Sequence, residues 1–145
     1  MRPARVRGTS DELSHQAEEE FRHGSLPKSR AVQEASVARL REKGKSQVLV
    51  YALARLSHFS LLAGDLDHDL AAADQGLTLA IELGDDLGRA QCMRRRGDVF
   101  FLLGRTQDAL AAYDQAEPLY LKVGNDLGRA NCVQSRGNVL FPAKD

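Results

Sequence analysis

The chain has 145 residues, of which 43% are hydrophobic, 6% are aromatic and 28% are charged. Twenty Lys and Arg residues balance twenty Asp and Glu residues, so we expect neither a nucleic-acid nor a membrane partner. The length fits a single domain with its own core. No apolar run follows the arginines near the N-terminus, so we expect no signal peptide and a cytoplasmic location.

An internal repeat organises the rest of the chain. The segment GDDLGRA at 84–90 recurs as GNDLGRA at 124–130, and eleven of eighteen positions are identical between 84–101 and 124–141. Glycines recur with the same period of forty residues, in the two series Gly24, Gly64, Gly104 and Gly44, Gly84, Gly124. Repetition at this period is typical of a helical array.

The repeat predicts seven helices, near 9–23, 27–43, 46–63, 67–83, 86–103, 106–123 and 126–141. They pair as hairpins 9–43, 44–83 and 84–123 and a half-hairpin 124–141, in one domain over 9–141, with a flexible segment 1–8 and a tail 142–145. In the clearest unit, Asp86 and Thr106 are the expected N-caps of the two helices, and Gly104 ends the first. The predicted fold is all-α, an array of antiparallel helical hairpins.

Four residues of this unit carry a family resemblance. The pattern of small, small, large and small residues Gly97, Ala109, Tyr113 and Ala116 resembles the signature of the tetratricopeptide repeat. The forty-residue length is similar to the longer repeats of Pins-type polarity scaffolds and of sensor regions in some bacterial transcription regulators. The pattern weakens toward the N-terminus, where the corresponding residues are Ser57, Asp69 and Gly76, and Ala17, Ser29, Gln33 and Ser36.

The resemblance implies a right-handed superhelix whose first helices line a concave groove for a peptide or partner protein. The groove positions carried over from the family are Tyr51, Ala54, His58, Leu61, Gln91, Arg94, Asp98, Phe101, Asn131, Gln134, Asn138 and Phe141. Amide side chains are frequent in this set, and they can donate to and accept from a peptide main chain. We therefore expect a binding module rather than an enzyme, with no cofactor.

Other patterns in the sequence favour structural roles. Consecutive residues of a helix point about 100° apart, so Arg94, Arg95 and Arg96 are not expected to form one nucleic-acid surface. Arg96 recurs as Arg136, which indicates a role between hairpins. The acidic segment 65–69 lacks the rest of a calcium loop, and we interpret Asp65 and Asp67 as turn and cap residues.

The histidines and cysteines give no metal or redox pattern. His15, His23, His58 and His68 lack zinc-ligand spacing. Cys92 and Cys132 occupy equivalent positions of neighbouring hairpins, about 10 Å apart, which is too far for a disulfide. We expect no metal site, and cysteines that are reduced and buried.

Two alternatives to a peptide-binding adaptor remain open from the sequence. One is a regulatory or sensor module of a larger signalling or transcriptional protein, and the other is a structural self-assembly module. The final half-hairpin has no second helix to cover its apolar face, so we expect a homodimer with Leu140 and Phe141 near the contact. The alternative is that the chain is a fragment and that the missing helix lies in a longer parent protein.

Overall fold

The computed structural model describes residues 8–22 and 26–142, and these residues form helices joined by short turns, without a strand among them. The helices are α1 Ser10–Arg22, α2 Leu26–Glu42, α3 Gln47–Leu62, α4 Leu66–Leu83, α5 Asp86–Leu102, α6 Thr106–Lys122 and α7 Asp126–Leu140. Each end lies within one residue of its predicted place, which confirms the all-α fold. Residues 1–7 and 143–145 of the expected flexible segment and tail, together with His23 and Gly24, lie outside the described residues.

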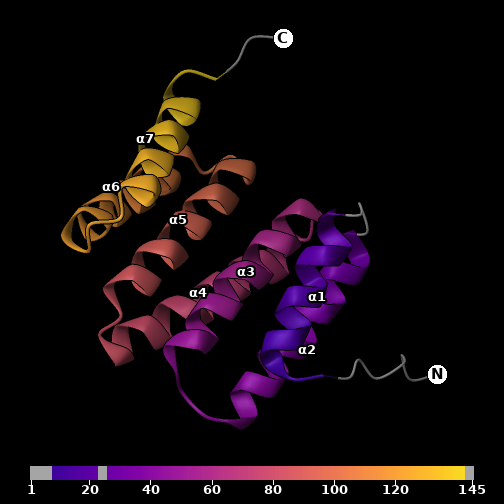
Figure 1. The fold of residues 1–145 in the computed structure, drawn as a ribbon. Helices are drawn as coiled ribbons and strands as arrows, with labels where there is room; N and C mark the ends of the chain where they lie inside the picture. The colour runs from indigo at the N-terminus through magenta and orange to yellow at the C-terminus, as the bar shows by residue number, and fades with distance from the viewer. Residues whose placement is uncertain (1–7, 23–25, 143–145) are drawn as a thin grey trace.

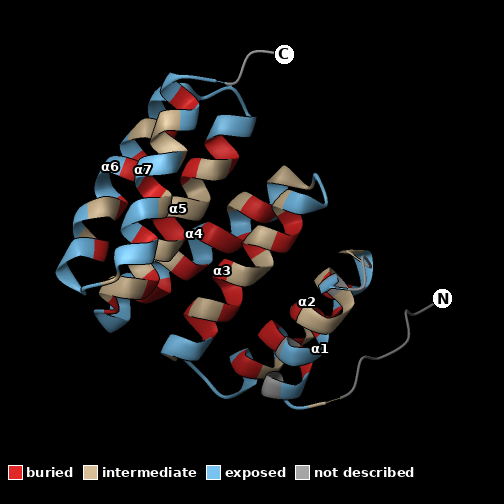
Figure 2. Cartoon of the chain, turned by 45° about the horizontal axis from the view of Figure 1, so that its top comes forward, coloured by how far each residue is buried: buried red, intermediate tan, exposed pale blue. Residues whose placement is uncertain are grey.

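The helices stack in chain order as antiparallel hairpins, with α1 and α2 at one end of the array and α7 at the other (Figure 1). Each second helix packs on its own first helix and on the first helix of the next hairpin, and α5 also contacts both α3 and α7. One buried cluster runs from Val37 and Leu40 of α2 through Leu53 of α3 and Ala80 of α4 to Cys92 of α5. This cluster joins the first three hairpins, and Figure 2 shows buried residues along the inner sides of the helices.

Glycines make the turns, as the sequence predicts. Gly44, Gly64, Gly84, Gly104 and Gly124 all have positive φ, between 66° and 95°. This left-handed conformation places a Cβ against the backbone and favours glycine. Gly84 is the C-cap of α4, and its N–H reaches the carbonyl oxygens of Ala80 and Ile81.

The expected N-caps of α5 and α6 were each wrong by one residue. Asp85, not Asp86, caps α5, and its Oδ1 accepts a hydrogen bond of 3.0 Å from the N–H of Gly88. Asp86 already has helical geometry because it is the first residue of the helix. Thr106 likewise begins α6 itself, and Arg105 precedes it without a side-chain capping bond.

The signature residues form the contact within the third hairpin. Gly97 of α5 faces Tyr113 of α6 so closely that a Cβ added at Gly97 would lie 2.6 Å from the ring. Ala109, Tyr113 and Ala116 are at most 1% exposed. Small residues thus let the two helices approach closely enough to bury a whole tyrosine between them.

The first two hairpins use the same positions with polar residues. Ser57 and Asp69, equivalent to Gly97 and Ala109, are fully buried, and the Ser57 hydroxyl donates to Asp69 Oδ1. Gln33, equivalent to Tyr113, is also fully buried, and its Nε2 donates to the carbonyl oxygen of Ala52 at 3.2 Å. In the second hairpin a hydrogen bond between the two helices therefore takes the place of the aromatic contact, whereas Gln33 binds the first helix of the next hairpin. The signature is weak there because polar residues fill its positions.

A repeated ion pair links successive hairpins. Arg96 of α5 lies 2.7 Å from Asp74 of α4, and Arg136 of α7 lies 3.1 Å from Asp114 of α6. Both members of the pair recur with the forty-residue period. The structural role expected of Arg96 and Arg136 follows directly from this geometry.

Candidate functional site

Two adjoining cavities lie along the face made by α1, α3 and α5, and we call them together the groove. The first has a volume of about 450 Å³ and is lined by Glu18, Arg22, Arg55, His58, Phe59 and Arg95. The second has a volume of about 420 Å³ and is lined by Tyr51, Ala54, Arg55, Leu87, Gln91, Arg94 and Arg95. Arg55 and Arg95 line both cavities and so mark the centre of the groove.

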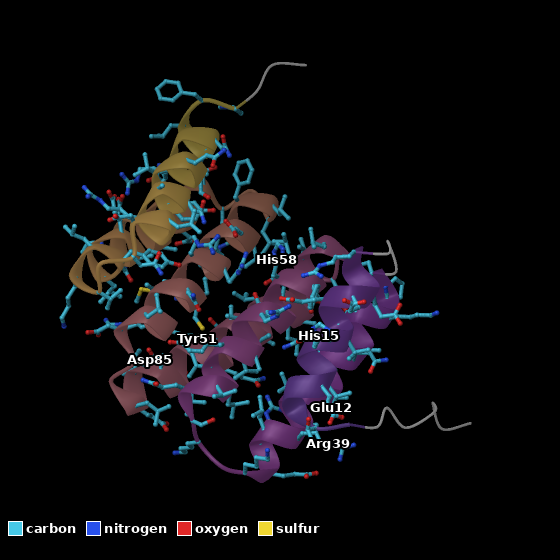
Figure 3. The ribbon with its side chains drawn as sticks, in the orientation of Figure 1. Glu12, His15, Arg39, Tyr51, His58 and Asp85 are labelled. Atoms are coloured by element: carbon cyan, nitrogen blue, oxygen red, sulfur yellow. The ribbon has the colours of Figure 1, made fainter. Side chains whose placement is uncertain are left out.

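Helical spacing brings these side chains to one face. Tyr51, Arg55 and His58 follow one another along α3 at intervals of four and three residues, and Gln91 and Arg95 lie four residues apart on α5. Residues three and four apart are neighbours on a helix surface. Figure 3 labels Tyr51 near the start of α3 and His58 nearer its end.

Arg55 and Arg95 have donors left for a ligand. Arg55 Nη1 lies 2.6 Å from Glu18 Oε1 of α1, and this pairing lowers the pKa of Glu18. Arg95 Nη1 lies 3.1 Å from His58 Nδ1 and 3.9 Å from Asp98 Oδ2. A guanidinium has five N–H donors. In both arginines the contacts to these neighbours use Nη1 alone, which leaves donors for a ligand.

His58 is held in its neutral form. A guanidinium can only donate, so Nδ1 of His58 accepts from Arg95 and the ring proton is on Nε2. Burial, together with the positive charges of Arg95, Arg94 and Arg55, lowers the pKa of His58 to about 4. At neutral pH the ring therefore adds no charge, and the positive character of the groove comes from its arginines.

Arg94 and Asp98 are engaged by the tyrosines of α6. Arg94 Nε donates to the Tyr120 hydroxyl at 3.2 Å, and the Tyr113 hydroxyl donates to Asp98 Oδ1 at 2.5 Å. Burial raises the pKa of Asp98 despite the hydrogen bond from Tyr113. Both predicted groove residues thus also belong to the packing of the third hairpin. Arg94 lines the groove, and Asp98 does not.

The structure brings some of the predicted residues together and separates others. Tyr51, Ala54, Gln91 and Arg94 line the second cavity, and His58 lines the first. Phe101 is 39% exposed, and it borders neither cavity. Asn131, Gln134 and Asn138 of α7 also border neither cavity, and the last two are exposed.

Arg55 and Arg95 are the central residues that the sequence interpretation missed. Their separation equals the forty-residue period, so the repeat itself placed them at equivalent positions of α3 and α5. Arg96 is separate from this surface and pairs with Asp74, as expected. Arg94 and Arg95, in contrast, line the same cavity, because residues at adjacent positions can both flank a wide groove.

The end of the array exposes apolar side chains. Leu140 is 53% exposed and Phe141 is 82% exposed. Their exposure is what a contact with another chain requires, and the homodimer stays a prediction.

The remaining polar candidates have structural partners. Asp65 caps α4 through its bond to the N–H of His68 and pairs with Arg30 at 2.7 Å. Cys92 and Cys132 are free and buried, and burial raises their pKa values to about 12 and about 11. Within 8–22 and 26–142 no group of three or more His, Cys, Asp and Glu side chains is arranged to hold a metal ion. No helix in these ranges is both long and apolar enough to cross a membrane.

Comparison with protein-family models finds no model that matches the chain, and comparison with curated proteins finds no similar sequence.

Proposed function

We propose that the chain is a protein-interaction module that binds an extended, acidic segment of another polypeptide in the groove between α1, α3 and α5. The observation that carries the proposal is the pair Arg55 and Arg95, which lines both cavities with guanidinium groups that have five N–H donors each. The resemblance to tetratricopeptide repeats supports a peptide as the ligand. The role is one of binding rather than catalysis.

The charge of the groove favours an acidic ligand. Four arginines and one glutamate line the two cavities, and Glu18 is already paired with Arg55. A carboxylate that enters between Arg55 and Arg95 gains charge-assisted hydrogen bonds in a partly desolvated site, where such bonds are strongest. Asp or Glu side chains of the ligand therefore supply the affinity, and charge complementarity raises the association rate.

The other lining residues suit a peptide backbone. Gln91 can both donate and accept a hydrogen bond, and Tyr51 presents an aromatic surface with a hydroxyl at its tip. Leu87 and Phe59 add apolar contact at opposite ends of the groove. A mixed lining of this kind is typical of sites that hold a peptide main chain and select one or two side chains.

The test is a peptide selection followed by charge-matched variants. A library of random twelve-residue peptides is panned on the full chain, and binding of the enriched peptides is measured by calorimetry. We expect enrichment in Asp and Glu, and affinity that falls as salt rises. The double variant Arg55→Gln, Arg95→Gln should bind at least about tenfold more weakly, because each charged hydrogen bond contributes about 1.5–3 kcal/mol.

The matched control removes two exposed arginines elsewhere. The double variant Arg41→Gln, Arg105→Gln has the same change in net charge but leaves the groove intact, so its affinity should equal that of the wild type. Enrichment of neutral or basic peptides, or an equal loss in both double variants, would refute the proposal. Fractionation of the source cells tests the cytoplasmic location, which stays a prediction.

A further inference from the structure

The exposed side of α7 repeats the surface with which α5 holds α6. On α5, Met93 is 5% exposed and Phe100 is 6% exposed, and both are buried together with residues of α6. On α7 the equivalent residues Val133 and Leu140 are 50% and 53% exposed. The apolar positions are therefore kept in the repeat, but no helix of the described chain covers them.

The centre of this surface is an open seat for an aromatic ring. The ring of Tyr113 fills the space beside Gly97 of α5, where it would lie 2.6 Å from an added Cβ. Gly137 of α7 is the equivalent residue. Apart from its chain neighbours and the backbone of its own helix, no atom of the described residues lies within 4 Å of the place where its Cβ would be. A glycine in mid-helix costs about 1 kcal/mol relative to alanine, so an empty glycine seat is a feature that a bound ring would explain.

Polar groups surround the seat at the same places as on α5. Tyr113 donates to Asp98 and Tyr120 accepts from Arg94, and the equivalent residues of α7 are Asn138 and Gln134, both exposed. Asn138 offers an acceptor and Gln134 a donor, so each can make the corresponding hydrogen bond. The chemistry that α5 offers to α6 is thus available on α7.

We propose that this face of α7 is a docking site for one amphipathic helix of a partner polypeptide, with a tyrosine that enters the seat at Gly137 and alanines four residues before and three residues after it. The pattern is that of Ala109, Tyr113 and Ala116 in α6. Such a contact places an amphipathic helix in a groove, with anchor residues three or four positions apart along the helix. The site is distinct from the groove between α1, α3 and α5.

A second copy of the chain fits this face less well. Its helices α2, α4 and α6 are each packed between two first helices, and the face equivalent to this one in a second copy is that of its own α7. Two such faces would place glycine opposite glycine and leave both seats unfilled. An unfilled seat forfeits the dispersion contacts that stabilise a helix pair.

The probe for the test is a fluorescein-labelled peptide with the sequence of residues 105–123, acetylated and amidated at its ends. Fluorescence anisotropy measures its binding to the full chain. We expect saturable binding, and at least about tenfold weaker binding of the same peptide with Tyr113→Ala, because a buried aromatic anchor dominates such contacts.

The variant Gly137→Leu places a side chain in the seat, where an added Cβ has open space, and should also weaken binding at least about tenfold. The matched variant Ala111→Leu adds an equal side chain at an exposed position of α6 and should bind like the wild type. Circular dichroism confirms that both are folded.

Three results would overturn the proposal. One is equal affinity of the two peptides. Another is binding that does not depend on Gly137, as expected if the peptide displaces α6 from α5. The third is a dimer of the wild type in light scattering that Gly137→Leu converts to a monomer, because a second copy would then occupy the face.

Discussion

Gly97 and Gly137 occupy the same position of the repeat, so one substitution at both sites compares a filled seat with an empty one. Gly97 lies against Tyr113, which is 1% exposed, whereas Gly137 has open space around its Cβ position. The perturbation is Gly97→Ala in one variant and Gly137→Ala in another. Each adds a single methyl group to the interior of a helix.

The backbone effect of the two substitutions is the same and favourable. Alanine is about 1 kcal/mol better than glycine inside a helix. At Gly97 the added methyl would lie 2.6 Å and 2.9 Å from two ring carbons of Tyr113, so the ring must shift. Overpacking of a core costs about 1–3 kcal/mol. Gly137→Ala should therefore stabilise by about 0.5–1 kcal/mol, and Gly97→Ala should be less stable than Gly137→Ala by about 1–3 kcal/mol.

Urea unfolding followed by circular dichroism measures both free energies of unfolding, with the slope of the transition as a check that the unfolded state is unchanged. In a thermal scan the difference between the variants should be about 3–9 °C, since 1 kcal/mol shifts the midpoint by about 3 °C in a chain of this size. Equal stability of the two variants would refute the close contact of Gly97 with Tyr113, and with it the packing assigned to the third hairpin.

Three further predictions concern buried groups. The pKa of His58 is about 4 against an ordinary 6.5, so the contribution of the neutral ring to stability is fully present above pH 6.5 and is lost as the pH falls toward 4. Over this interval the free energy of unfolding of the wild type should fall by on the order of 1–2 kcal/mol more than that of His58→Gln, a value reduced for solvent screening. Urea titrations at each pH measure this difference. Burial raises the pKa of Asp69 to about 6, so the contribution of its protonated form to stability is present below pH 3.8 and is lost as the pH rises through 6. The variant Asp69→Asn keeps an acceptor for Ser57 and should be more stable than the wild type at pH 7 by on the order of 1 kcal/mol. An equal or lower urea midpoint of the variant would contradict this. Cys92 has a pKa raised to about 12, so Ellman's reagent should modify it only as fast as the chain unfolds, and rapid modification of the native chain would show that the thiol is accessible.

The helices could be predicted closely because two independent signals agree. The apolar spacing gives the phase of each helix, and glycines with positive φ mark where α2, α3, α4, α5 and α6 end. The N-cap of α5 was predicted one residue too late, since Asp85 and Asp86 are both residues that can cap a helix. Which of them does so depends on the backbone angles at the turn, and a sequence does not give these.

Part of the groove could also be predicted, since the repeat places equivalent residues on equivalent faces. The family resemblance assigned Tyr51, His58 and Gln91 to a groove, and these three residues line the two cavities. The pattern does not say how far a long side chain reaches. We therefore predicted that Arg94 and Asp98 bind a ligand, although the tyrosines of α6 also bind them.

The polar core of the second hairpin could not be predicted. Asp69 stands where the third hairpin has Ala109, and a carboxylate at a core position argues against burial. Its burial depends on the hydroxyl of Ser57, which comes from the facing helix at the position of Gly97. The two changes compensate each other, and such pairing becomes visible only when both helices are placed.

The most direct test of the central claim is a map of where an acidic peptide binds. The backbone amides of the full chain are followed by NMR during titration with the tightest peptide from the panning experiment. The proposed function predicts that the largest shifts occur on α3 and α5 at Tyr51, Arg55, Gln91 and Arg95, and that they vanish in the variant Arg55→Gln, Arg95→Gln. Shifts confined to the outer faces of α4 and α6, or unchanged in that variant, would contradict it.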